Sequence, residues 1–412
     1  MTKLLARIGP LRALTVALFA ALSLSLPALA DEVSLTPLTA QVETLRERHF
    51  LREVNQKTLP RAELRSFLEK QMEKDLPMPI DEYVGVLRAL HLIGKGDGIG
   101  PMLDLYEAQV LAFYDPVSHV FYSLDKPPAA AGALPEAMQK AVIIHELTHA
   151  LQDQLFNAGA RMQGVQDDWD AQLAYQSVLE GEATLIMMGY LGETMGMKLE
   201  DMVSSPDLLK TLTAASSANA GVPETTPRYF VESLKFPYIA GIGFVIDAYK
   251  RQGWNGVDQI DRCPPTTTAE INDPALYWKI VASAGGIQAN KSVGNTSSLG
   301  VFHWDFLLGQ GASTGWMGDR VEVQRPSSKE PTVLVETRWD SPKHARDFQH
   351  RYEEFLKSQN EHPWSVVTGS TVRIAYGGDR TASQKFTRNK NESKVTVRPR
   401  QCTPAVTAGA SK

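Results

Sequence analysis

One stretch constrains this chain more than any other: residues 141–154, which read AVIIHELTHALQDQ. The run is apolar and compatible with a helix. His145 and His149 stand four residues apart, so a helix projects both from one face, and both imidazoles can reach one Zn²⁺. Glu146 follows the first histidine and can hold a water molecule on that metal. The stretch therefore predicts a zinc site on a helix, called the motif helix below.

A zinc site with two histidines needs a third protein ligand, which leaves the fourth position for water. A second helix is predicted over about 170–191, with Asp168 or Asp170 as its cap. It carries Glu180 and Glu182 in an otherwise apolar run. A buried carboxylate is costly unless it is paired or bound to a metal. We predict Glu180 as the third ligand, with Glu182 as the alternative.

The remaining carboxylate has a second predicted role. Glu182, or Asp153 on the motif helix, could accept a hydrogen bond from the far nitrogen of His145 or His149 and so fix the ring. The alternative for both carboxylates is a solvated helix position. Gly181 is expected to let its helix approach the motif helix closely, because it has no side chain.

A β-hairpin is predicted shortly before the motif helix. Residues 109–114 and 119–122 are β-rich, and a turn sequence, DPVS, separates them. A strand at the edge of a sheet beside the metal could pair with an extended peptide, whereas the alternative is a purely structural hairpin. His119 is predicted as a strand residue rather than a ligand.

An apolar helix is predicted from Phe236 through Ala248, and Gly253 with Trp254 ends it. Tyr238 is a candidate to donate to the oxyanion that forms when water attacks a carbonyl. Its alternative is a core tyrosine. Residues 214–227 are predicted as a loop that is either mobile over the cleft or simply a connection, and residues 263–274 as a loop that could rim the site.

The first 30 residues have the pattern of a secretory signal peptide: three basic residues, an apolar run over 13–26, and a small-residue cleavage site near Ala30. Its removal would change the formal net charge from −5 to −8. Such a balance disfavours nucleic acid and acidic membrane surfaces as partners. We predict an exported protein, periplasmic or secreted, without a transmembrane span in the mature chain. An uncleaved membrane anchor is the alternative.

The chain is predicted to be α+β and mostly helical. The predicted parts are a helical segment over 31–93, which packs on the core or acts as a pro-segment, a catalytic core over 94–312, a small α+β unit over 313–404 and a disordered tail over 405–412. Around and within the small unit, helices are predicted near 299–308 and 342–357, and strands at 321–323, 333–337, 372–375 and 394–397.

The chain has two cysteines, Cys263 and Cys402. In an oxidising compartment they could pair and tie the C-terminal tail to the middle of the chain. Two independent thiols are the alternative, and neither cysteine has the spacing of a metal site.

These pieces resemble the gluzincin-type zinc metallopeptidases, with their HExxH…E pattern, and more narrowly a group of bacterial exported proteins with HELTHALQDQ and a following EG[DE]A helix. The matching pieces are residues 110–116, 145–154, 180–184, 237–245, 253–254, 264–277 and 315–320. The resemblance implies a zincin-like core with His145, His149 and Glu180 as ligands and Glu146 as the catalytic base. One departure is Asp273-Pro274, where a His-Pro pair is expected.

We therefore predict an exported zinc-dependent endopeptidase acting on peptides or proteins, with Glu146 as general base. A non-catalytic envelope protein that keeps a zincin fold for binding or scaffolding is the competing hypothesis. A third is an enzyme silenced by its own N- or C-terminal segment. The sequence predicts neither the cleavage specificity nor the oligomeric state.

Overall fold

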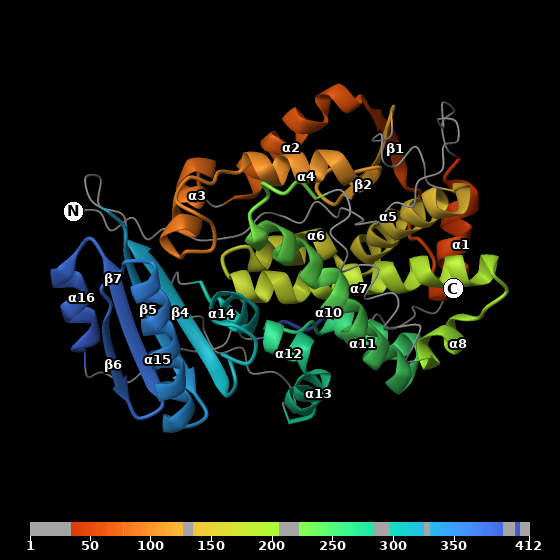
Figure 1. The fold of residues 1–412 in the computed structure, drawn as a ribbon. Coiled ribbons are helices and arrows are strands. Elements are labelled where there is room, and N and C mark those ends of the chain that lie inside the picture. The colour runs from red at the N-terminus through yellow and green to blue at the C-terminus, as the bar shows by residue number, and fades with distance from the viewer. Residues whose placement is uncertain are drawn as a thin grey trace.

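The structure is a computed structural model that describes residues 34–76, 78–126, 135–205, 222–283, 297–324, 330–389 and 400–403. The described chain is α+β and mostly helical, as predicted, with a three-stranded and a four-stranded sheet (Figure 1). Several predictions lie outside the described residues: the signal peptide at 1–30, most of the loop at 214–227, the strand at 394–397 and the tail at 405–412.

The motif helix is α5 (Glu136–Phe156), and its prediction is confirmed. It starts directly after Pro135 and stops at Asn157, which takes a left-handed conformation with φ 56° and donates its N–H to the carbonyl of Asp153. The stretch 141–154 is buried throughout. Polar motif residues therefore lie in the core, where each needs a partner.

The second predicted helix is α7 (Trp169–Thr194), which lies between α5 and the long helix α10 (Arg228–Gln252). Asp168 caps it, since its carboxylate accepts from the N–H of Ala171 at 3.1 Å. The short helix α6 (Ala158–Val165) connects α5 to α7. Few residues outside helices therefore connect α5 to α7, and these two helices, which carry the motif residues, pack against each other.

Helix α10 begins earlier than predicted. Pro227 stands at its N-cap, so the helix starts at Arg228, and Pro237 lies inside it. Proline removes one backbone hydrogen bond from a helix interior, which is why the sequence favoured a start near that residue. Burial of one side of α10 against α7 stabilises the continuous helix. Its end is as predicted, because Gly253 takes φ 58°.

Gly181 serves a different contact from the predicted one. A Cβ at Gly181 would lie 2.4 Å from the carbonyl oxygen of Gly241, and a Cβ at Gly241 would lie 2.1 Å from that of Ser177. Both glycines therefore permit close packing of α7 on α10, and the expected approach of α7 to α5 is wrong as the reason for Gly181. This close packing brings α10 beside the motif residues.

By length and composition, α10 is also apolar enough to cross a membrane. The helix predicted in this region, 236–248, is too short to cross a bilayer, and the observed helix reaches this length because it extends over Arg228–Gln252. Within the described residues, 67% of its most apolar window is buried inside the protein. A core helix of a globular protein has this character, and α10 packs as one.

The predicted hairpin is confirmed as β2 (Ala112–Asp115) and β3 (Val120–Leu124). The sheet order is β1-β3-β2, so β2 forms an edge, and it packs against α5. The strand β1 (Asn55–Leu59) pairs with β3 in parallel and was not predicted. Its sequence, NQKTL, buries only Leu59, so backbone pairing with a distant strand forms it without an apolar signal.

The N-terminal segment is therefore not wholly helical. Its helices are α1 (Thr36–Arg46), α2 (Arg61–Asp75) and α3 (Ile80–Ala89), and β1 lies between the first two. Helix α4 (Gly100–Gln109) then leads into the hairpin. Helix α1 packs directly on α5 and α7, whereas α2 contacts α4 and β1 pairs with β3.

The C-terminal unit contains a four-stranded antiparallel sheet of order β4-β5-β7-β6, seen at one end of the molecule in Figure 1. Three predicted strands are confirmed, and the predicted helices are α14 and α15, while β6 and α16 were missed. The bounds are α14 (Gly300–Leu308), β4 (Trp316–Gln324), β5 (Thr332–Trp339), α15 (Pro342–Ser358), β6 (Trp364–Thr368), β7 (Thr371–Gly377) and α16 (Arg380–Thr387).

The predicted loop 263–274 contains a short helix, α12 (Thr268–Asn272), and leads into α13 (Pro274–Ser283). Asp273 lies between them, and its Oδ1 accepts from the N–H of Ala275 at 3.1 Å. Asp273 is thus a turn residue that caps α13. The remaining helices within the described residues are α8 (Leu199–Ser204) and α11 (Trp254–Arg262).

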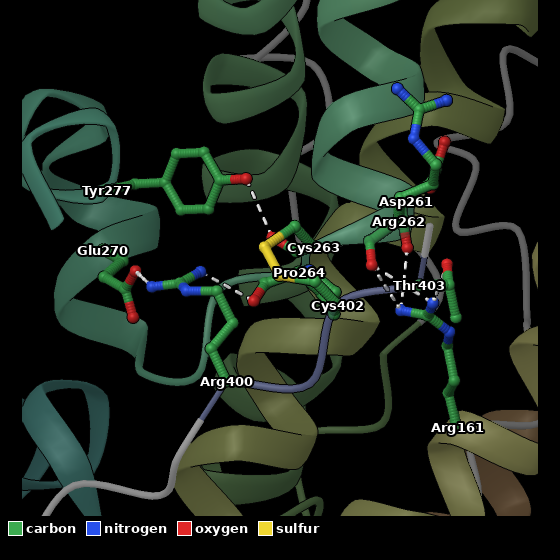
Figure 2. Close-up of a disulfide and its surroundings, with 10 residues drawn as sticks. All are labelled: Arg161, Asp261, Arg262, Cys263, Pro264, Glu270, Tyr277, Arg400, Cys402 and Thr403. Carbon is green, nitrogen blue, oxygen red and sulfur yellow. Dashed lines mark hydrogen bonds and ion pairs between the residues drawn. A yellow bond between two sulfur atoms is a disulfide. The ribbon is translucent and has the colours of Figure 1, made fainter. Parts of the chain in front are cut away.

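Cys263 and Cys402 form a disulfide (Figure 2). Two arginines reinforce the attachment of the C-terminal tail to the helical part. Arg161 donates to Thr403 Oγ1 at 2.6 Å, and Arg400 donates to the carbonyl of Pro264 at 2.7 Å and pairs with Glu270. The tail is thereby held at 400–403 against the segment between α11 and α12.

Candidate metal centre

The structure brings the two histidines of α5 and Glu180 of α7 together. His145 Nε2 lies 3.1 Å from Glu180 Oε2 and 3.1 Å from His149 Nε2, and the third distance, His149 Nε2 to Glu180 Oε2, is 3.6 Å. All three side chains are buried. Among the described residues, this is the one group of three or more His, Cys, Asp or Glu side chains that could hold a metal ion.

The spacing of these three atoms fits a tetrahedral metal. Zinc bonds to histidine nitrogen and carboxylate oxygen are about 2.0–2.2 Å long, which places two tetrahedral ligand atoms roughly 3.3–3.5 Å apart. The three measured separations, 3.1, 3.1 and 3.6 Å, lie around that value. The arrangement can therefore accept a cation with small movements of the side chains, and it leaves one coordination position for water or substrate.

His149 is held with its metal-facing nitrogen ready to bind. Gln152 Nε2 donates to the carbonyl of Leu179 at 3.1 Å and to Glu182 Oε2 at 2.6 Å, which turns Gln152 Oε1 toward the ring. His149 Nδ1 lies 2.8 Å from that oxygen and must be the donor. The proton is thereby placed on Nδ1, and Nε2, which faces the cluster, is the nitrogen that holds either a second proton or a metal ion.

Gln152 therefore fills the role that was predicted for Glu182 or Asp153, and that prediction is wrong in its direct form. The position of Gln152 in the sequence could have indicated this contact, since Gln152 and His149 are three residues apart and face each other on a helix. Glu182 accepts a hydrogen bond from Gln152 Nε2 and so helps to hold His149 indirectly. Glu182 is not a member of the His145, His149 and Glu180 cluster.

Glu182 is held in turn by Arg46 from α1. Arg46 is fully buried; it pairs with Glu182, with Asp258 at 2.9 Å and with Asp261 at 3.3 Å. These contacts join α1, α7 and α11 around one guanidinium. Because the network extends from Arg46 through Glu182 and Gln152 to His149, α1 belongs to the structural support of the site. This favours packing on the core over a removable pro-segment.

Replacing Arg46 with alanine is expected to destabilise the fold by about 3–5 kcal/mol, because three buried carboxylates would lose their shared positive charge. The matched control is Arg48→Ala. Arg48 pairs with Asp258 too, but its side chain is 30% exposed, so its loss should cost about 1 kcal/mol or less. Urea unfolding of both variants checks this. Equal costs would show that the burial of Arg46 is unimportant.

Asp153 has a structural position at the hairpin. Its Oδ2 accepts from the Tyr114 hydroxyl at 3.0 Å and lies 2.8 Å from His119 Nδ1, and its Oδ1 accepts from the N–H of Gly159. His119 lies in the turn between β2 and β3 with φ 54°, not in a strand as predicted. It is not in the metal cluster. Asp153 thus fastens the hairpin to the motif helix.

Glu146 is buried beside the edge strand. Its Oε2 accepts from the backbone N–H of Tyr114 in β2 at 3.0 Å. No sequence pattern predicts this contact, because it joins a backbone group to a side chain 32 residues away. One oxygen of Glu146 is therefore held by β2, and β2 lies directly against the metal-binding turn of α5.

Tyr238 lies at the centre as well. Its ring stacks on that of His145, with centroids 5.9 Å apart and planes inclined by 19°. Burial, followed by the charges of Glu180 and Glu146, raises the pKa of its hydroxyl well above the ordinary value. The hydroxyl therefore stays protonated and is a hydrogen-bond donor beside both carboxylates.

The electrostatics of the metal-free cluster show how strongly it favours positive charge. Burial acts to raise the pKa of Glu180, but hydrogen bonds from His145 and His149 outweigh it and lower that pKa to about 2. Burial acts to lower the pKa of His149, but Glu180 and then Glu146 raise it to about 9. Burial lowers the pKa of His145. Two carboxylates thus stabilise a positive charge here, either a proton or a metal ion.

Gln152→Ala is expected to weaken the binding of a metal ion at this candidate site, measured with Zn²⁺, by about 10–100-fold, because the His149 ring loses the acceptor that fixes its orientation and tautomer. Gln154→Ala is the matched control, since the amide of Gln154 bonds to the backbone of Leu51 and Arg52 and not to a ligand. Competition with a chromogenic chelator measures both affinities. An unchanged affinity in the Gln152 variant would contradict this role.

Comparison with known proteins informs the C-terminal part alone. Residues 283–407 match a family described as a domain of unknown function, DUF8575. That segment includes α14, the four-stranded sheet and Cys402, and it does not include α5 or α7. No curated protein and no solved structure matches the chain.

Proposed function

We propose that this protein is a zinc-dependent peptidase with a zincin-like core of the gluzincin type. The observation that carries the proposal is the convergence of His145, His149 and Glu180 within 3.6 Å of one another, next to a Glu146 that an edge strand holds in place. A purely structural metal site needs no additional carboxylate beside its ligands, whereas hydrolysis needs a general base.

The donor set favours zinc. Two imidazole nitrogens and one carboxylate oxygen, with a fourth position left for water, form the usual protein contribution to a catalytic zinc site. Hard cations such as Mg²⁺ and Ca²⁺ prefer oxygen ligands throughout. When bound, zinc lowers the pKa of a coordinated water and polarises a carbonyl group.

Glu146 would transfer the proton, and Tyr238 would stabilise the oxyanion. The N–H of Tyr114 fixes Glu146 Oε2, so the other oxygen of Glu146 would take a proton from the attacking water and deliver it to the leaving amine. Tyr238, protonated and stacked on His145, would donate to the oxyanion. The edge strand β2 offers backbone groups with which an extended peptide could pair.

The disulfide between Cys263 and Cys402 supports export, because disulfides persist in oxidising compartments and are rare in the cytosol. This agrees with the signal-peptide pattern of residues 1–30. We therefore place the proposed peptidase outside the cytoplasm, in the periplasm or in the medium.

Metal analysis of the purified mature protein, followed by digestion of a peptide library with and without chelator, tests the proposal. We expect about one zinc per chain and cleavage that chelator abolishes and zinc restores. His149→Ala should lose both the metal and the cleavage. Zinc without any cleavage, even after limited trimming of either terminus, would favour the binding or scaffolding hypothesis instead.

A further inference from the structure

A cavity lies about one helical turn from the metal cluster. Its walls include Tyr83, Tyr106, Trp169, Gln176, Tyr229 and Leu234, from α3, α4, α7 and α10, and we call it the aromatic pocket. The space between its walls, which includes open solvent at the mouth, is about 590 Å³. Tyr106 and Gln176 are half-buried and mark its mouth.

Two helices lead from the aromatic pocket to the metal cluster. Gln176 precedes Glu180 by four residues on α7, and Leu234 precedes Tyr238 by four on α10, so each pair shares a helix face about one turn apart, a rise of about 6 Å. The helices run in the same direction where Gly181 meets Gly241 and Val245. The pocket therefore lies beside the cluster on the Tyr238 side.

The aromatic pocket is uncharged. Among the described residues, no acidic, lysine or arginine side chain lines it. His303, also in the wall, is neutral, since burial lowers its pKa to about 4. Its Nδ1 donates to the carbonyl of Leu299 at 2.5 Å, so its Nε2 accepts from the Tyr229 hydroxyl at 3.1 Å. A charged occupant would lose its hydration without gaining a counter-ion.

The pocket wall also holds a hydrogen-bond donor without an acceptor. Trp169 is fully buried, and its Nε1 has no hydrogen-bond partner among the described residues. Its ring contacts Tyr83 and His303 at centroid distances of 6.0 and 5.5 Å. An occupant with an aromatic body would pack on these rings, and an acceptor at its polar end would pair with the buried indole N–H once the Trp169 ring turns toward the cavity; a tyrosine side chain has this chemistry.

We propose that the aromatic pocket binds a neutral aromatic side chain of the substrate, with tyrosine preferred, and so selects the residue beside the scissile bond. This inference rests on the proposed peptidase function. The pocket at one side of the metal then determines which substrate side chain is preferred, while β2 pairs with the substrate backbone whatever its side chains.

The test compares peptides that differ at one position. We expect the zinc-loaded protein to cleave beside tyrosine and phenylalanine at least about 100-fold better, in kcat/KM, than beside lysine or aspartate. Trp169→Phe should reduce the preference for tyrosine over phenylalanine about tenfold. Gln176→Glu, which adds a negative charge at the mouth, should raise cleavage beside lysine or arginine about tenfold. Equal cleavage beside charged and aromatic residues would overturn the proposal.

A binding measurement separates this proposal from the peptidase function. The metal-free wild-type protein is mixed with N-acetyltyrosinamide or N-acetyllysinamide, and saturation-transfer NMR detects the bound ligand. Binding of the tyrosine compound alone, weakened in Trp169→Phe, supports the pocket even if no peptide is cleaved. Cleavage without aromatic preference would support the peptidase function but contradict the proposed role of the aromatic pocket. Equal binding of both compounds would contradict that role as well.

Discussion

Glu146→Gln is expected to retain zinc and to lose peptide hydrolysis by about 10²–10⁴-fold. The amide has the same shape as the carboxylate and can still accept from the N–H of Tyr114, but it cannot take a proton from the attacking water. The metal ligands are untouched by the change. Zinc content and kcat/KM on the best library peptide, measured on the same preparation, check both parts of this result.

Glu136→Gln is the matched control, since it changes the same residue type on the same helix. Glu136 is exposed in the first turn of α5 and pairs with Lys140, so full activity is expected. Full hydrolysis by the Glu146 variant would remove this carboxylate from the mechanism. Loss of its zinc would show instead that Glu146 is a ligand, and the assignment of Glu180 would then have to be revised.

The metal cluster was predictable from local spacing. His145 and His149 share a helix face wherever that helix forms, and a second apolar helix with an acidic residue restricts the third ligand to Glu180 or Glu182. The choice between the two depends on helix rotation. Each helical position is rotated by about 100° from the one before it, so Glu180 and Glu182, two positions apart, differ by about 200° around the helix. Glu180 therefore faces the histidines while Glu182 faces Arg46 and Gln152.

What the sequence did not predict are contacts between distant segments. Arg46 reaches Glu182 across 136 residues, and the N–H of Tyr114 reaches Glu146 across 32. No periodic pattern encodes such pairs. The strand β1 was missed for the same reason, because its partner β3 lies far along the chain and its own side chains are mostly polar. Gly181 was assigned to the wrong neighbour because a glycine reveals close packing but not its partner.

Replacing Cys263 and Cys402 together with serine is expected to lower the free energy of unfolding by about 5 kcal/mol, from the chain entropy of a closed loop of this length. The two cysteines are 139 residues apart, so the bond greatly restricts the unfolded chain. Thermal and urea unfolding measure the change. Reductant should destabilise the wild-type protein to a similar extent and leave the double-serine variant unaffected.

The same variant separates stability from chemistry. The disulfide adjoins Asp261 and Arg262, and Asp261 pairs with Arg46, yet none of these residues is a metal ligand (Figure 2). The folded double-serine variant should therefore bind zinc with unchanged affinity at 25 °C. Loss of zinc from the folded variant would instead show that anchoring the C-terminal tail affects the position of His149 through the contacts of Asp261, Arg46 and Glu182. The tail would then contribute to the structural support of the metal centre.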